Sequence, residues 1–221
     1  MNITVFLGAP GSGKGTQAKK LAQDKGFFHF STGDMLRAEI KKGTELGTKA
    51  RAYIDKGELV PDTVMIELIE DSLLRVRRDG NVLLDGFPRT LAQAKALDSK
   101  QSTSVGLSIL FEVPETLLIE RLTGRRSCSQ CAEPYHIVFI PPKVSGLCDK
   151  CGGKLTQRTD DTEDVVKRRL EVFKRQNDEL LHYYASKKNL ARIDANRSVN
   201  DIQQELSHVI EQWYTLNHSV N

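Results

Sequence analysis

The chain of 221 residues lacks any long hydrophobic run, any internal repeat and any marked excess of charge. Without about 18 consecutive apolar residues, no membrane-spanning helix is expected. The formal net charge is only +3, which gives little electrostatic drive toward nucleic acid or a membrane surface. The N-terminus enters the first expected strand without a basic region or a cleavage site. We therefore expect no secretory signal and a cytoplasmic protein.

Cysteine is scarce, and all four cysteines lie between residues 128 and 151. Because cytosolic cysteines are rarely paired as disulfides, their arrangement indicates another use. They form two Cys-x-x-Cys pairs, namely Cys128 with Cys131 and Cys148 with Cys151. This spacing is typical of a four-thiolate zinc site, and four protein ligands favour a structural metal. Idle reduced thiols or a redox pair are the alternatives, and we expect His136, in the same segment, to form hydrogen bonds without binding the metal.

What the chain does contain is a composition typical of soluble globular proteins, with 39% hydrophobic and 28% charged residues. Its length suffices for one α/β domain with insertions. Apolar strand patterns alternate with helical patterns, which predicts a parallel sheet covered by helices. The expected strands are Asn2–Gly8, Phe28–Phe30, Asn81–Asp85, Gly106–Val113 and Leu190–Asp194. The main expected helices are Lys14–Lys25, Asp62–Leu74, Thr90–Leu97, a helix opened by Pro114, Thr162–Ser186 and Asn200–Trp213, with a frayed tail to Asn221.

A glycine-rich stretch, residues 8–16, lies where the first strand passes into the first helix. Its glycines permit unusual backbone angles, and its bare amides at a helix N-terminus form an anion site. Lys14 would reach the bridging and terminal phosphates, and the Thr16 hydroxyl would enter a magnesium shell. Gly15 stands where the strict phosphate-loop pattern has serine or threonine. A strand-to-helix turn without a ligand is therefore the alternative.

Two further side chains are candidates for phosphate chemistry at the sheet's carboxyl edge. Asp85 ends an apolar strand, and in phosphate-loop proteins such an aspartate orders the waters around magnesium. A turn or helix cap is its simpler role. Arg89 lies in a loop held by Gly86 and Pro88, where it could clamp a phosphate, although it could also be a solvated surface arginine. Asp62, and either Thr32 or Asp34, could cap the helices that follow them.

These residues resemble the adenylate kinase family, in its long-lid, zinc-containing type. The matching motifs follow the family's order over nearly the whole chain. They are 8–16, 31–37, 84–89 with Gln93, 124–126, 135–136, 141–143, 149–153 and 158–161. The resemblance implies a P-loop NTPase-type α/β fold with a five-stranded parallel sheet and helices on both faces. It divides the chain into a core (1–30, 61–123 and 162–221) and two mobile insertions, a helical NMP-binding segment (31–60) and a zinc-containing lid (124–161).

The resemblance also implies roles for individual residues. For AMP they are Thr32, Arg37, Glu58, Leu59, Val60, Gly86, Phe87, Pro88, Arg89, Gln93, Arg158 and Arg169. For ATP they are Gly11, Ser12, Gly13, Lys14, Gly15, Thr16, Arg121, Arg125, Pro134, Tyr135 and Arg197. Phosphoryl transfer would use Lys14, Arg89, Arg125, Arg158 and Arg169, with Asp85 beside Mg²⁺. Among Lys167, Arg168 and Arg169, only the resemblance selects Arg169. Ala132 departs from the glycine that zinc-type relatives often have, which bears on the first cysteine turn.

The expected function is reversible phosphoryl transfer from Mg-ATP to AMP, giving two ADP, by a monomer that also binds structural Zn²⁺. The expected partners are nucleotides, with no nucleic acid and no membrane. A related nucleoside monophosphate kinase with another acceptor or donor is the first alternative, although Gln93 favours an adenine acceptor. A hydrolytic ATPase or a zinc-ribbon nucleic-acid binder is the second. The segment with the cysteines has no stripe of aromatic and basic residues to support the last of these.

Overall fold

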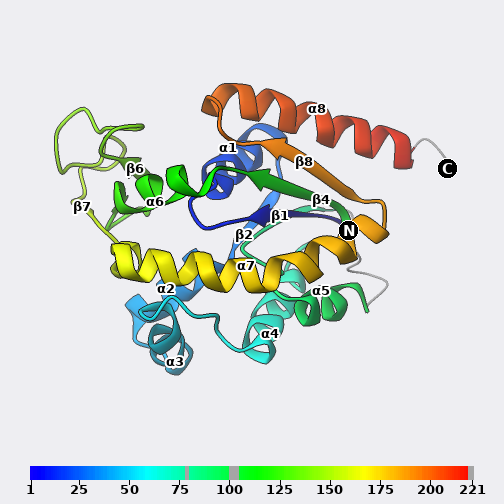
Figure 1. The fold of residues 1–221 in the computed structure, drawn as a ribbon, viewed down its shortest axis with the longest axis horizontal. Helices are drawn as coiled ribbons and strands as arrows, with labels where there is room; N and C mark the ends of the chain where they lie inside the picture. The colour runs from blue at the N-terminus through cyan, green and yellow to red at the C-terminus, as the bar shows by residue number, and fades with distance from the viewer. Residues whose placement is uncertain (78–79, 100–104, 219–221) are drawn as a thin grey trace.

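A five-stranded parallel sheet forms the centre of the protein, whose computed structural model describes residues 1–77, 80–99 and 105–218 (Figure 1). Its strands lie in the order β2-β3-β1-β4-β8, and every neighbouring pair is parallel. They are β1 (Asn2–Gly8), β2 (Phe28–Ser31), β3 (Asn81–Asp85), β4 (Val105–Glu112) and β8 (Leu190–Asp194). Since β1 is central, the loop after it lies at the middle of the carboxyl edge. All five predicted strands and the fold class are confirmed, with bounds shifted by at most one residue.

Helices cover both faces of this sheet because its strands are apolar on both sides. Alternate residues of β1 face opposite ways: Ile3 and Val5 belong to one buried cluster, and Phe6 to the other. The first cluster packs against α4 (Asp62–Leu73), α5 (Leu91–Asp98) and α7 (Glu163–Ser186). The second packs against α1 (Lys14–Lys25) and α8 (Val199–His218). Figure 1 shows these two layers below and above the sheet.

Residues 31–60 contain two helices, α2 (Thr32–Lys42) and α3 (Glu45–Ile54). Gly43 ends α2 with a left-handed φ of 70°. The helices approach each other closely at Gly47, where an added Cβ would lie 2.3 Å from the backbone of Glu39. This close approach makes the two helices a compact pair beside the sheet.

The residues that cap the helices differ from those expected. Ser31 caps α2 by accepting a hydrogen bond from the Asp34 amide, whereas neither Thr32 nor Asp34 does so. No side chain caps α4. The Asp62 carboxylate instead accepts hydrogen bonds from Gln93, in α5, and from Thr90, the residue that precedes α5. Helix α8 extends to His218, beyond the expected end at Trp213. The expected frayed tail at 219–221 lies outside the described residues.

Residues 124–161 follow α6 (Glu115–Thr123) and are more ordered than the loop-rich segment predicted from sequence. They contain a three-stranded antiparallel sheet in the order β6-β5-β7, formed by β5 (Arg125–Cys128), β6 (Pro134–His136) and β7 (Leu155–Thr156). A short 3-10 helix, Thr159–Asp161, leads into α7. The buried cluster of this segment has only four members: Cys128, Tyr135, Cys148 and Leu155. The sequence did not predict these three strands because they are too short to show an alternation of apolar and polar residues.

Over the part of the chain that the structure describes, no helix combines the length and the apolar character needed to cross a bilayer.

Candidate functional site

A cavity of about 610 Å³ opens at the carboxyl edge of the central sheet. The loop after β1 forms its floor, and segments from both insertions form its walls. Helix α7 closes one side with residues that recur at helical spacing, from Arg169 to Leu180. The cavity therefore lies where ligands bind in open parallel sheets, beyond the carboxyl ends of the strands.

The floor of the cavity has the geometry of a phosphate-binding loop. Gly13 precedes α1 with φ of 94°, a left-handed conformation that disfavours other residues. The Lys14 ammonium folds back over the loop and donates to the carbonyl oxygens of Gly8 (2.7 Å) and Ala9 (2.8 Å) and to Ser12 Oγ (3.1 Å). It thus lies above the amides at the start of α1, where an anion would bind.

Lys14 has an unusually low pKa of about 8, against an ordinary value of 10.5. Burial is the largest cause, because the surrounding protein replaces the water that would solvate the ammonium. Asp85 opposes this effect, whereas the positive charges of Arg89, Arg169 and Arg125 lower the pKa further. A bound anion would reverse the effect of these charges and favour the protonated amine.

Asp85 lies at the end of β3, directly beside the phosphate-binding loop. A Cβ placed on Gly15 would be 3.3 Å from Asp85 Oδ2. The His29 imidazole lies near this carboxylate, with its Nε2 4.0 Å from Asp85 Oδ2. Burial lowers the pKa of His29, which favours its neutral form. The Asp85 carboxylate and the Thr16 hydroxyl are oxygen donors suited to a hard divalent cation.

One wall of the cavity comes from the start of α2 and the loop after β3. Thr32 Oγ1 donates to the Gly86 carbonyl at 2.9 Å, which ties the two segments together. Arg89 Nε donates to the same carbonyl at 2.8 Å, so its guanidinium is held at the cavity edge. Arg37 of α2 donates to Asp34 Oδ1 at 2.7 Å. These contacts place two arginines around one end of the cavity.

The 124–161 segment and α7 bring three more arginines to the cavity, two of which are oriented by buried aspartates. Arg125 binds Asp161 through two hydrogen bonds, Nε to Oδ2 at 2.7 Å and Nη2 to Oδ1 at 2.5 Å. Arg169 Nη1 donates to the Asp160 carbonyl (2.7 Å) and to Asp161 Oδ1 (3.0 Å). The third, Arg158, donates from Nε to Ser127 Oγ at 2.9 Å. Bidentate pairing and burial fix these planar groups in direction.

The arginines outnumber the carboxylates around the cavity, and their mutual repulsion is visible in their pKa values. The pKa values of Arg89, Arg158 and Arg169 are all lowered, first by burial and then by neighbouring arginines. Arg89 is open toward the cavity, yet protein surrounds it on the other sides and limits its hydration. An anion with several charged oxygens would relieve this repulsion. The cavity is therefore built for a highly charged anionic ligand.

The far end of the cavity has more apolar residues, and α6, β6 and the start of α8 line it. Arg121 donates to the Ala195 carbonyl at 3.1 Å. His136 accepts at Nδ1 from the amides of Val138 and Phe139, each at 3.0 Å, so its remaining proton is on Nε2 near the Glu120 carbonyl. This confirms the predicted hydrogen-bonding role of His136 and fixes the turn that carries Phe139 into the cavity wall.

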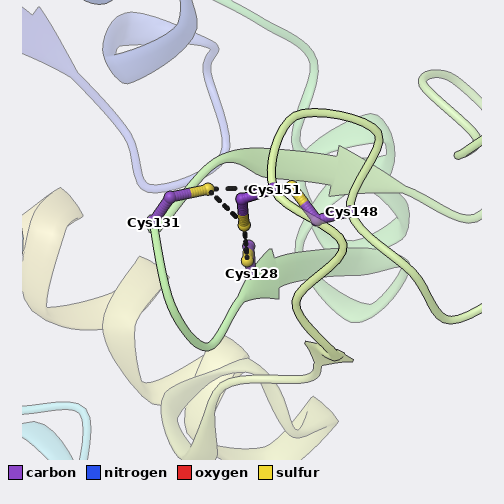
Figure 2. Close-up of side chains that lie close together, drawn as sticks. All are labelled: Cys128, Cys131, Cys148 and Cys151. Atoms are coloured by element: carbon purple, nitrogen blue, oxygen red, sulfur yellow. Dashed lines mark hydrogen bonds between the residues drawn. The ribbon is translucent and has the colours of Figure 1, made fainter.

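The four cysteines come together at the end of β5, to which Cys128 belongs (Figure 2). Their sulfur atoms all lie within 4.8 Å of one another. The Sγ atoms are 3.4 Å apart for Cys128 and Cys151, 3.4 Å for Cys151 and Cys131, and 3.7 Å for Cys131 and Cys148. A tetrahedron with zinc–sulfur bonds of about 2.3 Å has sulfur–sulfur edges of about 3.8 Å. The four thiols thus fit a tetrahedral zinc ion and are not joined as disulfides.

Surrounding groups favour the thiolate form at Cys128 and Cys148, whereas at Cys151 the Gly153 amide lowers the pKa but the thiols of Cys131 and Cys128 outweigh it and raise the pKa to about 12. The Tyr135 hydroxyl accepts from the Asp149 amide (2.8 Å) and lies 3.5 Å from Cys148 Sγ, to which it can donate its proton. This contact is the largest cause that lowers the pKa of Cys148 to about 6. Backbone amides, that of Cys131 first, lower the pKa of Cys128. The residue after each pair has left-handed φ: 58° at Ala132 and 71° at Gly152.

Comparison with known proteins identifies the family. The family model described as adenylate kinase matches residues 6–189. The chain belongs to the adenylate kinase family. It is 46% identical over 213 residues to an adenylate kinase of Clostridium tetani, covering 95% of this chain and 98% of the relative. Relatives with the same name from Bacillus licheniformis and Methanothrix thermoacetophila are each 47% identical, covering 95% and 96% of this chain and 98% and 100% of the relatives.

Most residues selected by resemblance to the adenylate kinase family line the cavity. They are Gly11, Ser12, Gly13, Lys14, Gly15, Thr16, Thr32, Arg37, Glu58, Leu59, Val60, Asp85, Gly86, Pro88, Arg89, Arg121, Arg125, Pro134, Tyr135, Arg158, Arg169 and Arg197. Phe87 and Gln93 do not line it and are only 1% and 2% exposed. Of the three successive basic residues on α7, Arg169 lines the cavity, whereas Lys167 and Arg168 are exposed and pair with glutamates.

Sequence reasoning missed the residues that orient the arginines. Asp160 and Asp161 are 5% and 0% exposed, and both accept from Arg169. The only signal was two adjacent acidic residues directly after Arg158 and Thr159, within a segment treated as the close of the lid. Buried carboxylates among arginines follow from tertiary contacts such as Arg125 with Asp161, which are 36 positions apart.

In this adenylate kinase family member, residues 124–161 also form hydrogen bonds with α1 and with the 31–60 segment. Lys41 of α2 donates to the Ser129 carbonyl at 3.1 Å, and Lys19 of α1 donates to the Ala132 carbonyl at 3.1 Å. Thr159 Oγ1 donates to Asp55 Oδ1 at 2.9 Å. The turn that contains Cys128 and Cys131 therefore forms hydrogen bonds with both α1 and the 31–60 segment.

Proposed function

We propose that this protein catalyses reversible transfer of the terminal phosphoryl group from Mg-ATP to AMP, giving two ADP. The observation that carries the proposal is the group of five arginines around a phosphate-binding loop (Arg37, Arg89, Arg125, Arg158 and Arg169), in a chain of the adenylate kinase family. In the transfer, the bond between the β-bridging oxygen and the γ-phosphorus breaks. A bond from an AMP phosphate oxygen to the same phosphorus forms. No proton has to move, because the acceptor oxygen is already anionic near neutral pH.

The chain's own residues would act by position and charge. The loop from Gly11 to Thr16 and Lys14 would bind the donor phosphates, and Arg89 with Arg37 would hold the AMP phosphate. Arg125, Arg158 and Arg169 would surround the phosphoryl group during its transfer. Asp160 and Asp161 would be the buried carboxylates beside them. Preorganised charges of this kind stabilise negative charge that spreads over several oxygens. The far end of the cavity, with Arg121, Pro134, Tyr135 and Arg197, would bind the donor base.

Two metals complete the proposal. Mg²⁺, bound with the nucleotide, would neutralise phosphate charge, and the Thr16 hydroxyl and the Asp85 carboxylate are the groups suited to its hydration shell. Zn²⁺ would be held by Cys128, Cys131, Cys148 and Cys151, with no open position for catalysis. Its effect would be to keep the small lid folded, since four buried residues are too few for an independent core.

Residues 31–60 and 124–161 are proposed to move as units over the core formed by 1–30, 61–123 and 162–221. Their closure would exclude water, which competes with AMP as acceptor. The contacts that join the two segments, from Lys41 and Thr159, are polar and suited to break and re-form. We also propose a cytoplasmic monomer, for which sedimentation at micromolar concentration is the direct check of the oligomeric state.

A coupled assay for ADP formation tests the function. Purified protein with Mg-ATP is given AMP, UMP, CMP, GMP or no acceptor. The expected result is rapid ADP formation from Mg-ATP when AMP is the acceptor, and not with UMP, CMP, GMP or no acceptor. Rapid ADP formation without an acceptor would mean ATP hydrolysis and would remove the argument for a closing lid. Preference for UMP or CMP would keep the phosphoryl transfer and reject the adenine acceptor.

A further inference from the structure

Gln93, like Phe87, is a residue expected to contact AMP that does not line the cavity. It lies in the first turn of α5, is 2% exposed, and does not line the cavity. Its side-chain amide is bound at both ends. Oε1 accepts from the Arg89 backbone N–H at 2.8 Å, and Nε2 donates to Asp62 Oδ1 at 2.7 Å. The side chain therefore connects a cavity arginine to the start of α4.

The chemistry of these two partners fixes the orientation of the amide. A backbone N–H can only donate, and an ionised carboxylate can only accept. A rotated amide would place its NH₂ group against the Arg89 N–H and its oxygen against the Asp62 carboxylate. Both hydrogen bonds would be lost inside the protein, where unpaired polar groups are costly. Asp62 and the Arg89 backbone together hold Gln93 in one orientation.

Asp62 binds a second residue of the same segment. Its Oδ2 accepts from Thr90 Oγ1 at 2.9 Å, and Thr90 Oγ1 in turn accepts from the Gln93 backbone N–H at 3.2 Å as the cap of α5. Each donor points along the network toward the carboxylate, so its polarity is consistent throughout. One aspartate thus holds both the cap of α5 and the side chain that supports Arg89.

The position of Asp62 in the chain gives this network its significance. Asp62 lies three positions after Leu59 and two after Val60, which line the cavity, whereas Arg89 belongs to another segment that lines it, Gly86–Arg89. The Arg89 guanidinium is bound to the Gly86 carbonyl, and its backbone is bound through Gln93 to Asp62. The network therefore joins the two segments that line the acceptor half of the cavity.

We propose that Asp62 is a positioning residue for the acceptor nucleotide: by fixing the Gln93 amide and the Arg89 backbone, it sets the distance between the two segments that bind AMP. This inference rests on the proposed function. A nucleotide in the donor half does not depend on the network, since the phosphate-binding loop and Arg121 have other supports. The effect of Asp62 is thus confined to one substrate.

The first test is the Asp62→Asn variant, which keeps the size of the side chain but makes one of its two ends a donor. A charge-assisted hydrogen bond is lost, which predicts a rise in KM for AMP of roughly tenfold. KM for ATP should stay within about twofold. Asp71→Asn is the matched control, because Asp71 lies on the exposed side of the same helix. An equal rise in both KM values, or no rise for AMP, would overturn the proposal.

A double variant with the two side-chain types exchanged separates positioning from direct contact. The single variant Gln93→Glu places two carboxylates together and should weaken AMP binding. Combining it with Asp62→Asn restores a hydrogen bond between the two positions with reversed polarity. The second carboxylate oxygen at position 93 can still accept from the Arg89 backbone N–H. If the two positions acted independently, the loss of kcat/KM for AMP in the double variant would be the product of the two single-variant losses. We expect kcat/KM to be at least about fivefold higher than that product predicts. Additive losses would contradict the coupling.

Two further controls keep the outcome interpretable. If Asp62→Asn does not fold, Thr90→Val removes one donor to the same carboxylate, together with the acceptor that caps α5, with little change in volume. It should raise KM for AMP about threefold while leaving KM for ATP unchanged, and equal changes would again overturn the inference. If the unmodified protein forms no ADP from ATP and AMP, the proposed function fails. If it does so and Asp62→Asn has no effect, only the inference fails.

Discussion

The central sheet and the lid are stabilised in different ways. The sheet is buried on both faces by two apolar clusters, to which helices on each side contribute. Residues 124–161, which we propose form the lid, have three short strands and a buried cluster of four residues, two of which are cysteines. Burial of apolar area grows with the size of a unit, so a small segment needs another source of stability. From this comparison we infer that metal ligation folds the part proposed to move, whereas packing folds the rigid part.

Loss of the metal should have the largest effect, and it should be confined to the lid. Structural zinc contributes about 10–16 kcal/mol of apparent binding free energy in zinc-finger peptides. In Cys148→Ser, or after chelation, we expect loss of bound zinc and rapid amide exchange over 125–156. Exchange in β1 and β3 should be unchanged. Hydrogen-exchange mass spectrometry with zinc analysis is the measurement, and equal protection of the lid with and without metal would remove the distinction.

Truncation of a core side chain should show the opposite distribution. Leu84 of β3 is fully buried in the first apolar cluster. Leu84→Ala should lower the free energy of unfolding by about 2–5 kcal/mol, through lost burial and the cavity left behind. Zinc content should stay unchanged. Urea unfolding is the measurement, with Leu74→Ala as the control, because Leu74 is 83% exposed and should change stability by less than about 0.5 kcal/mol.

The core also holds a lysine, Lys14, whose charge depends on pH near neutrality. Burial lowers the pKa of Lys14 to about 8 in the free protein, and bound phosphates favour its protonated form and raise that pKa. Affinity for Mg-ATP should therefore be nearly constant below about pH 8. Above this pH it should fall by up to about tenfold per pH unit. Calorimetric titration from about pH 7 to 10 checks this, and Lys14→Arg should abolish the decline. A flat profile in the unmodified protein would exclude the assignment to Lys14.

Within the lid, the two cysteine turns offer an internal comparison. Ala132 and Gly152 occupy equivalent positions after each pair, with φ of 58° and 71°. Because a left-handed conformation favours glycine, Ala132→Gly should stabilise the metal-bound lid by about 1 kcal/mol. Gly152→Ala should destabilise it by a similar amount. Competition with a chelator measures both, and changes of the same sign would contradict the backbone argument.

The smallest expected effect concerns the contact between the lid and the 31–60 segment. Lys41→Met removes the hydrogen bond to the Ser129 carbonyl. This hydrogen bond is exposed, and we expect it to contribute about 0.5 kcal/mol. We expect the closed population to fall roughly twofold, measured by energy transfer between labels on the two segments. Lys42→Met is the matched control, because the Lys42 amine binds Glu39 of its own helix. If both variants behave alike, the Lys41 contact has no part in closure.

The fold and the phosphate-binding loop could be predicted from the sequence because their signals are local. Apolar strands, glycine spacing and the lysine after Gly13 are all visible within a few residues of one another. The cysteine spacing likewise indicated a four-thiolate site, and the sulfur positions fit one. The departure at Ala132 was also visible, and the structure shows its consequence as a left-handed residue.

Other features depend on contacts that no local pattern contains. The lid strands have two to four residues, too few for a periodic signal. The Asp62 carboxylate was expected to cap its own helix, but it binds Thr90 and Gln93, which are 28 and 31 positions away. Gln93 is consequently buried beside the cavity wall rather than in it. Side-chain orientation in such networks follows from tertiary packing, which propensity alone does not determine.

The most direct test of the central claim uses ADP as the only nucleotide. The protein with Mg²⁺ and ADP is followed by phosphorus NMR, which distinguishes ATP, AMP and inorganic phosphate in one spectrum. Phosphoryl transfer between two nucleotides in a closed cavity predicts ATP and AMP in equal amounts, without inorganic phosphate. Formation of AMP and inorganic phosphate without ATP would show transfer to water and would contradict the account.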